Sequence, residues 1–313
     1  MKPYYKTTRG ALYKGDCKKV LKKLPDESVQ CIITSPPYWK LRDYGDAGQL
    51  GLEKTIKKYI SNLVNIFQEA KRVLKKDGTV WLNIGDKYIG DKQAKANNLK
   101  TKDLCGLPWR LAFALQKDGW YLRQDIIWHK INPTPEPTKD RCTKAHEYLF
   151  LLSKSKKYYY NREPIREPVK ATTGKAFGAP KFGKHRIKGN YQIATSKTYK
   201  KIKGANKRSV WSIPKGNYKG AHFATFPPDL IIPCVLAGSK AGQVILDPLS
   251  GTNTVGLVCE KYKREWIAIE LSKEYCDLSI KRIKTEEVIA RDKSILRFLK
   301  TNKRKIKRRS QNG

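Results

Sequence analysis

The segment Gln243-Val-Ile-Leu-Asp-Pro-Leu-Ser-Gly-Thr-Asn-Thr254 decides the fold class of this 313-residue chain. It is an apolar strand pattern that enters a turn containing Gly251, and a helical pattern and the strand pattern Trp266–Glu270 follow it. A strand, a glycine turn and a helix, with an acidic residue about 20 positions further on, are typical of the nucleotide-binding half of a doubly wound sheet. The turn lacks G-x-G-x-x-G, which argues against a pyrophosphate site but still allows a nucleoside ligand without phosphates. The alternative is a strand, turn and helix with a purely structural role.

Similar strand and helix patterns alternate along the rest of the chain. The strand patterns are Ala11–Tyr13, Val29–Thr34, Thr79–Ile84, Tyr121–His129, Leu149–Leu152, Gln243–Leu246 and Trp266–Glu270. The helical patterns are Ile56–Leu74, Pro108–Lys117, Pro227–Leu236, Gly256–Lys261 and Lys273–Ile283. This alternation predicts an α/β fold with a mostly parallel, doubly wound, Rossmann-like sheet that is covered by helices on both faces.

The composition divides the chain into three parts. Residues 170–208 are rich in Lys, Gly, Thr and Ser and show no sustained period of 2 or 3.6, so we expect an inserted, basic, loop-rich segment. Residues 299–313 form a block of positive charge, which predicts a disordered tail. The remaining residues, 1–169 and 209–298, are expected to build one catalytic domain whose sheet takes strands from both ends of the chain.

Charge and cysteine content limit the class of partner. A formal net charge of +38 favours a polyanion such as nucleic acid, although a lysine-rich, solvated surface alone would also give it. Seven cysteines without a C-x-x-C pair and four histidines without an i,i+4 pair predict no metal site. We expect a cytoplasmic protein, because no apolar run approaches a membrane span of roughly 18 residues and the N-terminus lacks a secretory signal.

A second candidate site is the stretch Cys31-Ile-Ile-Thr-Ser35-Pro36-Pro37-Tyr38, in which an apolar strand leads into a Pro-Pro turn. Prolines lack an N–H donor, so the turn presents carbonyl oxygens without competing donors. The Ser35 hydroxyl and the Pro36 carbonyl can accept hydrogen bonds from an exocyclic amine, and Tyr38 offers a ring on which an extruded base can stack. The alternative is an ordinary Pro-Pro turn, but a position at the carboxyl end of a core strand favours a site.

The order of these motifs, with Ser35–Tyr38 first, the basic insertion second and Asp247–Gly251 last, resembles that of the permuted, β-class amino-methyltransferases of restriction–modification systems. The likeness covers roughly Leu12 to Ile283, apart from the insertion, residues 170–208, which we expect to be the target-recognition region. It extends through the segments Leu50–Glu53, Asp125–Trp128, His146-Glu147 and His222–Pro227. The resemblance implies a methyltransferase fold with circularly permuted motifs, S-adenosylmethionine as cofactor and DNA as substrate.

The resemblance also implies roles for individual residues. The cofactor contacts that it implies are made by Asp247, Pro248, Gly251, Thr252 and Asn253 in the turn, Glu270 at the ribose, Asp16 near the adenine, and His222 and Phe223 over the methionine portion. Asp16 is explained equally well as part of a Gly-Asp turn. Many members have Gly-Ser-Gly where this chain has Gly251-Thr252-Asn253, and Asn is the best non-glycine residue for a turn that needs positive φ.

Ser35 in first place and Asn253 resemble the cytosine-N4 subtype. The prediction is therefore a site-specific methyltransferase that acts on the N4 amine of cytosine in duplex DNA by in-line displacement, without a metal or a covalent enzyme intermediate. Duplex DNA is the expected partner. The resemblance also allows a cognate restriction endonuclease that acts on the same sequence without a stable complex, but the sequence does not tell whether one exists or the enzyme is solitary. Adenine N6 is the first alternative; methylation of RNA or of a protein amide, and nucleic-acid binding without catalysis, are the others. The recognition sequence and the oligomeric state do not follow from the sequence.

Overall fold

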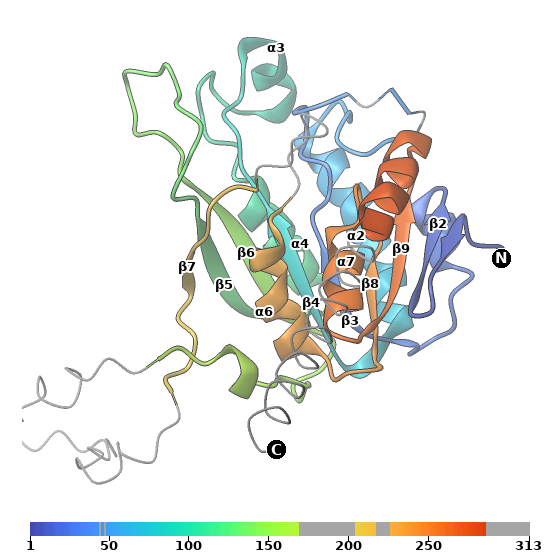
Figure 1. Cartoon of the computed structure of the whole chain (residues 1–313). Coiled ribbons are helices and arrows are strands. Elements are labelled where there is room, and N and C mark those ends of the chain that lie inside the picture. The colour runs from blue at the N-terminus through green and yellow to red at the C-terminus, as the bar shows by residue number, and fades with distance from the viewer. Residues whose placement is uncertain (44, 47, 169–203, 217–225, 286–313) are drawn as a thin grey trace, which may run out of the picture.

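The computed structural model describes residues 1–43, 45–46, 48–168, 204–216 and 226–285. These residues form one nine-stranded mixed sheet in the order β1-β2-β9-β8-β3-β4-β6-β5-β7 (Figure 1). The strands are β1 (Tyr5–Lys6), β2 (Gly10–Lys14), β3 (Val29–Thr34), β4 (Leu74–Ile84), β5 (Tyr121–His129), β6 (His146–Ser153), β7 (Val210–Ser212), β8 (Val244–Asp247) and β9 (Glu265–Glu270). Five of the eight pairings between neighbouring strands are parallel.

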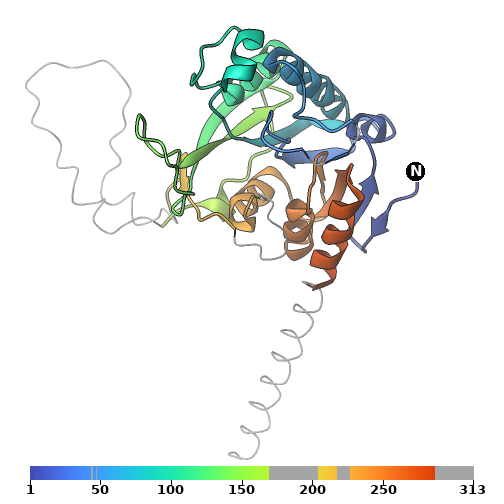
Figure 2. The ribbon, with the colours of Figure 1, turned by 90° about the horizontal axis from the view of Figure 1, so that it is seen from above.

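Helices cover both faces of the sheet, as the view from above shows (Figure 2). The helices are α1 (Cys17–Leu21), α2 (Ile56–Val73), α3 (Asp91–Ala94), α4 (Leu107–Lys117), α6 (Pro228–Gly238) and α7 (Thr254–Lys261), with 3₁₀ turns η1 (Lys95–Asn97) and η2 (Glu163–Ile165). Residues 273–285 are also helical. Helices α1, α2 and α4 contribute to one buried apolar cluster, and α6 and α7 to the cluster on the opposite face.

Helix α2 shows why the first cluster forms. Its N-cap, Thr55, accepts a hydrogen bond from the Lys58 N–H at 3.2 Å, which satisfies a free donor of the first turn. Tyr59, Leu63 and Phe67 follow at intervals of four residues, so they share one face and are almost fully buried. Complete burial of such a side chain stabilises the fold by about 1.5–3 kcal/mol.

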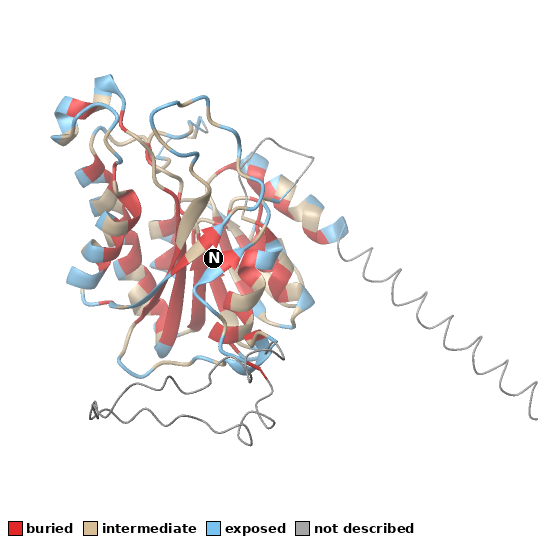
Figure 3. Ribbon diagram, turned by 90° about the vertical axis from the view of Figure 1, so that its left-hand side faces the viewer, coloured by how far each residue is buried: buried red, intermediate tan, exposed pale blue. Residues whose placement is uncertain are grey.

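The second cluster depends on close packing between helix α6 and the sheet. A Cβ atom on Gly238, the last residue of α6, would lie 2.7 Å from the Cys31 sulfur in β3. Only glycine therefore lets the end of the helix lie directly against the strand. The buried residues run through the strands and along the inner faces of the helices (Figure 3).

The sheet topology determines where a ligand can bind. Strands β2, β9, β8, β3 and β4 are mutually parallel, so their carboxyl ends lie at one edge of the sheet. Strand β3 leads towards α2 on one face, whereas its neighbour β8 leads into α7 on the other. Their contact, with Ile32 opposite Leu246, is therefore a topological switch point, where open α/β sheets bind ligands.

The predicted elements agree with the structure, with two clear shifts. Strands β3 and β5 have the predicted bounds, but β4 begins at Leu74 instead of Thr79, and β6 begins at His146 instead of Leu149. The α2 helix ends earlier than expected because Leu74 is already extended, with ψ of 136°, and pairs with Val29 of β3. In the described part of the chain, no helix is long and apolar enough to cross a bilayer.

The division into three parts stays a prediction. Most of the predicted insertion, residues 170–208, and the whole predicted tail, 299–313, lie outside the described residues. The two described ends of the insertion meet where Glu167 and Ala205 form an antiparallel bridge, with N–O distances of 2.8 and 2.9 Å. Glu167 and Ala205 are therefore neighbours in space, although most of the predicted insertion lies between them in the chain.

Candidate active site

The Ser35–Tyr38 turn begins directly where β3 ends, at the carboxyl edge of the sheet. Its backbone is fixed from α2, because the Tyr59 hydroxyl donates a hydrogen bond to the Pro37 carbonyl at 2.9 Å. The next residue, Trp39, is fully buried, and its indole N–H donates to the Glu53 carbonyl at 2.9 Å. The turn is thus held on both sides, and the predicted acceptor groups of Ser35 and Pro36 lie at the switch point.

The Tyr38 ring packs against the end of β4, and the Tyr38 hydroxyl makes a hydrogen bond. A Cβ on Gly85 would lie 2.7 Å from a carbon of the Tyr38 ring, so the glycine makes room for this ring. The Tyr38 hydroxyl donates to Glu147 Oε2 at 2.5 Å. Burial and the nearby Glu147 carboxylate raise the pKa of Tyr38 well above 10. The phenol therefore stays protonated, and remains a donor, at neutral pH.

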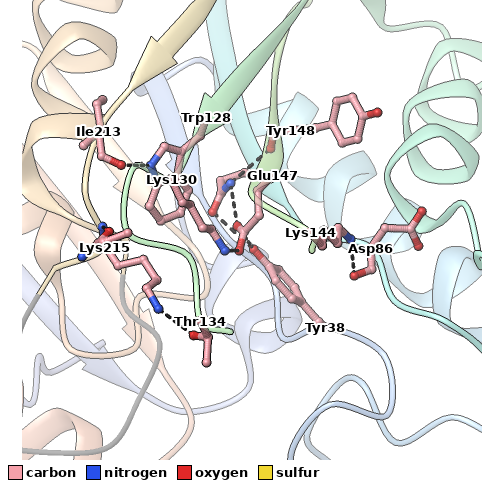
Figure 4. A network of polar contacts seen from close by, with 12 residues as sticks. Tyr38, Asp86, Trp128, Lys130, Thr134, Lys144, Glu147, Tyr148, Ile213 and Lys215 are labelled. Carbon is pink, nitrogen blue, oxygen red and sulfur yellow. Dashed lines mark hydrogen bonds and ion pairs between the residues drawn. The ribbon is translucent and has the colours of Figure 1, made fainter. Parts of the chain in front are cut away.

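Glu147, on β6, joins Tyr38 to two further side chains (Figure 4). Its Oε1 lies 2.5 Å from the Lys130 ammonium, and its Oε2 accepts a hydrogen bond from the Asn83 amide at 3.2 Å. Lys130 in turn lies over the Trp128 ring, 5.0 Å from its centroid. The sequence patterns assigned no role to these residues, and the only signals were the family likenesses at His146-Glu147 and Asp125–Trp128.

The turn after β8 has the backbone conformation that its residues predict. Gly251 and Asn253 have φ of 51° and 56°, so the expected positive φ at Asn253 is confirmed. The Asn253 side chain caps α7 by accepting a hydrogen bond from the Gly256 N–H at 2.9 Å. Asn253 is fully buried and, unlike Gly251, does not line the cavity at this edge of the sheet. Its observed contact is with the helix it begins.

The two carboxylates of this region have different surroundings. Glu270, at the end of β9, accepts hydrogen bonds from the Gly251 and Ser272 N–H groups at 2.8 and 2.9 Å and lines the cavity. Asp247, at the end of β8, is 1% exposed and accepts from the Leu249 N–H at 3.2 Å. Burial raises the pKa of both carboxyl groups to about 7. Asp247 thus shapes the turn, whereas Glu270 faces the open space.

The Ser35–Tyr38 turn and the turn around Gly251 line the same cavity, which has a volume of about 870 Å³. Its lining includes the predicted residues Ser35, Pro36, Pro37, Tyr38, Asp16, Pro248, Gly251, Thr252 and Glu270, together with Asn83, Trp128, Lys130 and Glu147. Asp16 also accepts a hydrogen bond from the Lys19 N–H as the N-cap of α1, so it caps this helix in addition to lining the cavity. His222 and Phe223 lie outside the described residues.

The family of the chain follows from its similarity to known proteins. The model of the DNA methylase family of N6 and N4 methyltransferases matches residues 29–281. The chain belongs to the N6/N4 DNA methylase family. The type II methyltransferase M.Cfr9I of Citrobacter freundii is 45% identical to this methylase over 294 residues, 88% of each chain. M.SmaI of Serratia marcescens is 46% identical over 287 residues, 86% of this chain and 89% of its own.

Solved structures have the same fold as the methylase. The cytosine-N4-specific PvuII DNA methyltransferase superposes with a TM-score of 0.65 at 21% identity, over 89% of this chain and 88% of its own. The TTHA0409 protein of Thermus thermophilus, solved in complex with S-adenosyl-L-methionine, gives 0.58 at 23% identity, over 89% and 96%. The predicted family, fold and DNA methyltransferase activity are confirmed.

Proposed function

We propose that this methylase transfers a methyl group to the N4 amine of cytosine in a short duplex sequence, as the modification enzyme of a type II restriction system. The observation that carries the proposal is the cavity in which Ser35–Tyr38 and the turn around Gly251 meet, although more than 200 residues separate them in the chain. One end of the cavity offers acceptors for an amine. The other offers a carboxylate and a turn for a nucleoside.

The residues of the second end fit S-adenosylmethionine. Glu270 presents a carboxylate to the cavity, and a carboxylate can accept the two hydroxyl hydrogens of a ribose. The Ser250 hydroxyl also belongs to the cavity wall and is buried, without a hydrogen-bond partner among the described protein groups. No atom lies within 4 Å of the position that a Cβ of Gly251 would take, so the turn leaves space for a ligand. When bound, the cofactor supplies an electrophilic methyl group.

The residues of the first end act on the amine. Its lone pair is delocalised into the base, so the two N–H groups must be held while the nitrogen turns this pair towards the methyl carbon. We assign these N–H groups to the Ser35 hydroxyl and the Pro36 carbonyl. Acceptors that are already in place stabilise the positive charge that develops on nitrogen. The base must leave the duplex stack, and stacking on Tyr38 offsets part of this cost by about 1–3 kcal/mol.

Two observations support cytosine N4 over adenine N6. The motif begins with an uncharged Ser35, as in the N4 subtype that the sequence resembles. A structure with the same fold is that of a cytosine-N4-specific enzyme. Relatives with 44–46% identity are type II methyltransferases, which supports the assignment to a type II restriction system. The physical chemistry of the corner serves both amines, so the choice of base rests on these likenesses.

The base is identified by its product. DNA methylated by the purified protein, digested to nucleosides and analysed by mass spectrometry, is expected to contain N4-methyldeoxycytidine. Sequencing of modified bases on the same DNA gives the recognition sequence. N6-methyldeoxyadenosine without N4-methyldeoxycytidine would reject the assignment of the base but keep the site. Methylation of RNA, with none of duplex DNA, would reject the substrate.

Cofactor affinity is expected to increase with pH. Because burial raises the pKa of Glu270 to about 7, much of this carboxyl group is protonated in the free protein at pH 6. The charged form accepts ribose hydroxyls more strongly, so the dissociation constant of S-adenosylmethionine should fall about tenfold between about pH 6 and 8. Calorimetry measures it, and Glu270→Gln should weaken the dependence. A dissociation constant independent of pH in the wild type would contradict the assignment.

A further inference from the structure

Three members of the polar network around Tyr38, namely Glu147, Asn83 and Lys130, have no part in the proposed transfer, yet they line the same cavity. The network joins four separate segments: Tyr38 follows β3, Asn83 lies near the end of β4, Lys130 follows β5, and Glu147 lies on β6 (Figure 4). In the sheet, β6 lies between β4 and β5, so Glu147 is placed between its partners by strand pairing. The sheet itself therefore brings Glu147 to Tyr38.

Both oxygens of the Glu147 carboxylate are occupied. Oε1 is paired with the Lys130 ammonium at 2.5 Å, and Oε2 accepts from the Tyr38 hydroxyl at 2.5 Å and the Asn83 amide at 3.2 Å. The Glu147 and Lys130 side chains are 12% and 19% exposed. At this burial a carboxylate needs such partners, and their number fixes its position. Glu147 is thus an anchored acceptor that points at the phenol.

The Tyr38 ring is held at both ends. Its edge rests on Gly85, where a Cβ would approach the ring to 2.7 Å, and its backbone follows the Pro37 carbonyl that Tyr59 holds. The Tyr38 hydroxyl donates to Glu147 Oε2 at 2.5 Å and makes a longer contact with Asn83 Oδ1 at 3.4 Å. The short contact with Glu147 is made at the tip of the ring, where a small rotation moves the stacking surface most. A misplacement of about 1 Å can cost a hundredfold in rate.

We propose that Glu147 is a positioning residue of the methylase: it holds the Tyr38 hydroxyl, so that the ring forms a fixed surface on which the extruded base stacks. The ion pair with Lys130 keeps the carboxylate in place. The inference rests on the proposed function in one respect, namely that the target base leaves the duplex and stacks on Tyr38. It does not depend on which base is methylated.

The test compares three variants with the wild type. Glu147→Ala removes the acceptor, Glu147→Gln keeps an oxygen acceptor without the charge, and Tyr38→Phe removes only the hydroxyl. The substrate is an oligonucleotide duplex that carries the site methylated by the wild type, mapped first by sequencing of modified bases. The measurements are kcat and KM for this duplex, the S-adenosylmethionine dissociation constant from calorimetry, and circular dichroism as a check of folding.

We expect Glu147→Ala and Tyr38→Phe to lower kcat by a similar factor, about 10- to 100-fold, because each removes the same hydrogen bond to a charged group. The cofactor dissociation constant should stay within twofold. The double variant should be no slower than Glu147→Ala, since the contact is already lost, and Glu147→Gln should recover most of the rate. Glu163→Gln, which alters an exposed glutamate paired with Arg162 and Arg166, is the matched control and should retain the wild-type rate.

Stacking can also be observed directly. With 2-aminopurine in place of the target base, an ordered Tyr38 ring quenches the fluorescence of the extruded base, so Glu147→Ala should lengthen its lifetime. Additive losses in the double variant, or a Tyr38→Phe variant as fast as the wild type, would overturn the proposal. Glu147→Gln as slow as Glu147→Ala would do the same, because the charge would then matter and the contact would not. If Glu147→Ala fails to fold, Tyr38→Phe alone still decides.

Discussion

Replacing Ser35 with alanine is expected to lower the rate of DNA methylation by about 100-fold while the affinity for S-adenosylmethionine stays within twofold. Ser35 is the first residue after β3, and it lines the cavity together with Pro36 and Tyr38. Its loss removes one of two preorganised acceptors for the amine, and removal of a single preorganised group that stabilises transition-state charge typically costs about 10²–10³ in rate. The cofactor end of the cavity is left unchanged.

Initial rates of methyl incorporation into DNA, with labelled S-adenosylmethionine, measure this effect. Ser28→Ala is a suitable control, because Ser28 lies just before the same strand and donates its hydrogen bond to the Pro25 carbonyl, away from the cavity. It should keep at least half of the wild-type rate. A folded Ser35→Ala variant with the full rate would remove Ser35 from the reaction.

The local patterns of the sequence predicted the core of the fold well. The β3 strand is buried along its whole length, so its run of apolar residues is a strong signal, and α2 repeats its apolar residues at helical spacing. The glycine-containing turn between β8 and α7 and the carboxylate at the end of β9 follow from the spacing between Gly251 and Glu270. No local pattern in the sequence shows that β3 pairs with β8. The prediction that the Ser35 and Gly251 motifs lie side by side therefore rested on the family resemblance.

The network at Glu147 shows what local patterns do not contain. Its partners Tyr38, Asn83 and Lys130 are separated from Glu147 by 109, 64 and 17 residues, and only the strand order brings them together. The orientation of the Asp247 side chain could not be predicted from the sequence either. The sequence places a carboxylate at the end of a strand, but whether it faces the cavity or the backbone of its own turn depends on the turn geometry.

Trp266 supports the strand that carries Glu270, and its removal should have the largest effect on stability. The Trp266 side chain is 1% exposed, and its indole N–H donates to Glu260 at 2.8 Å. It lies opposite Gly10 in the pairing of β2 with β9, where a Cβ on Gly10 would come within 2.2 Å of the ring. The missing side chain of Gly10 thus makes the space that the indole fills.

Trp266→Ala is expected to lower the free energy of unfolding by about 3–5 kcal/mol, because the lost burial of the indole adds to the cost of the space it leaves and no neighbouring side chain extends from Gly10 to refill it. Urea denaturation followed by circular dichroism measures the difference. Phe113→Ala, at a position on α4 that is 56% exposed, should change it by less than about 1 kcal/mol. Equal losses in the two variants would show that the pairing of β2 with β9 does not depend on the indole.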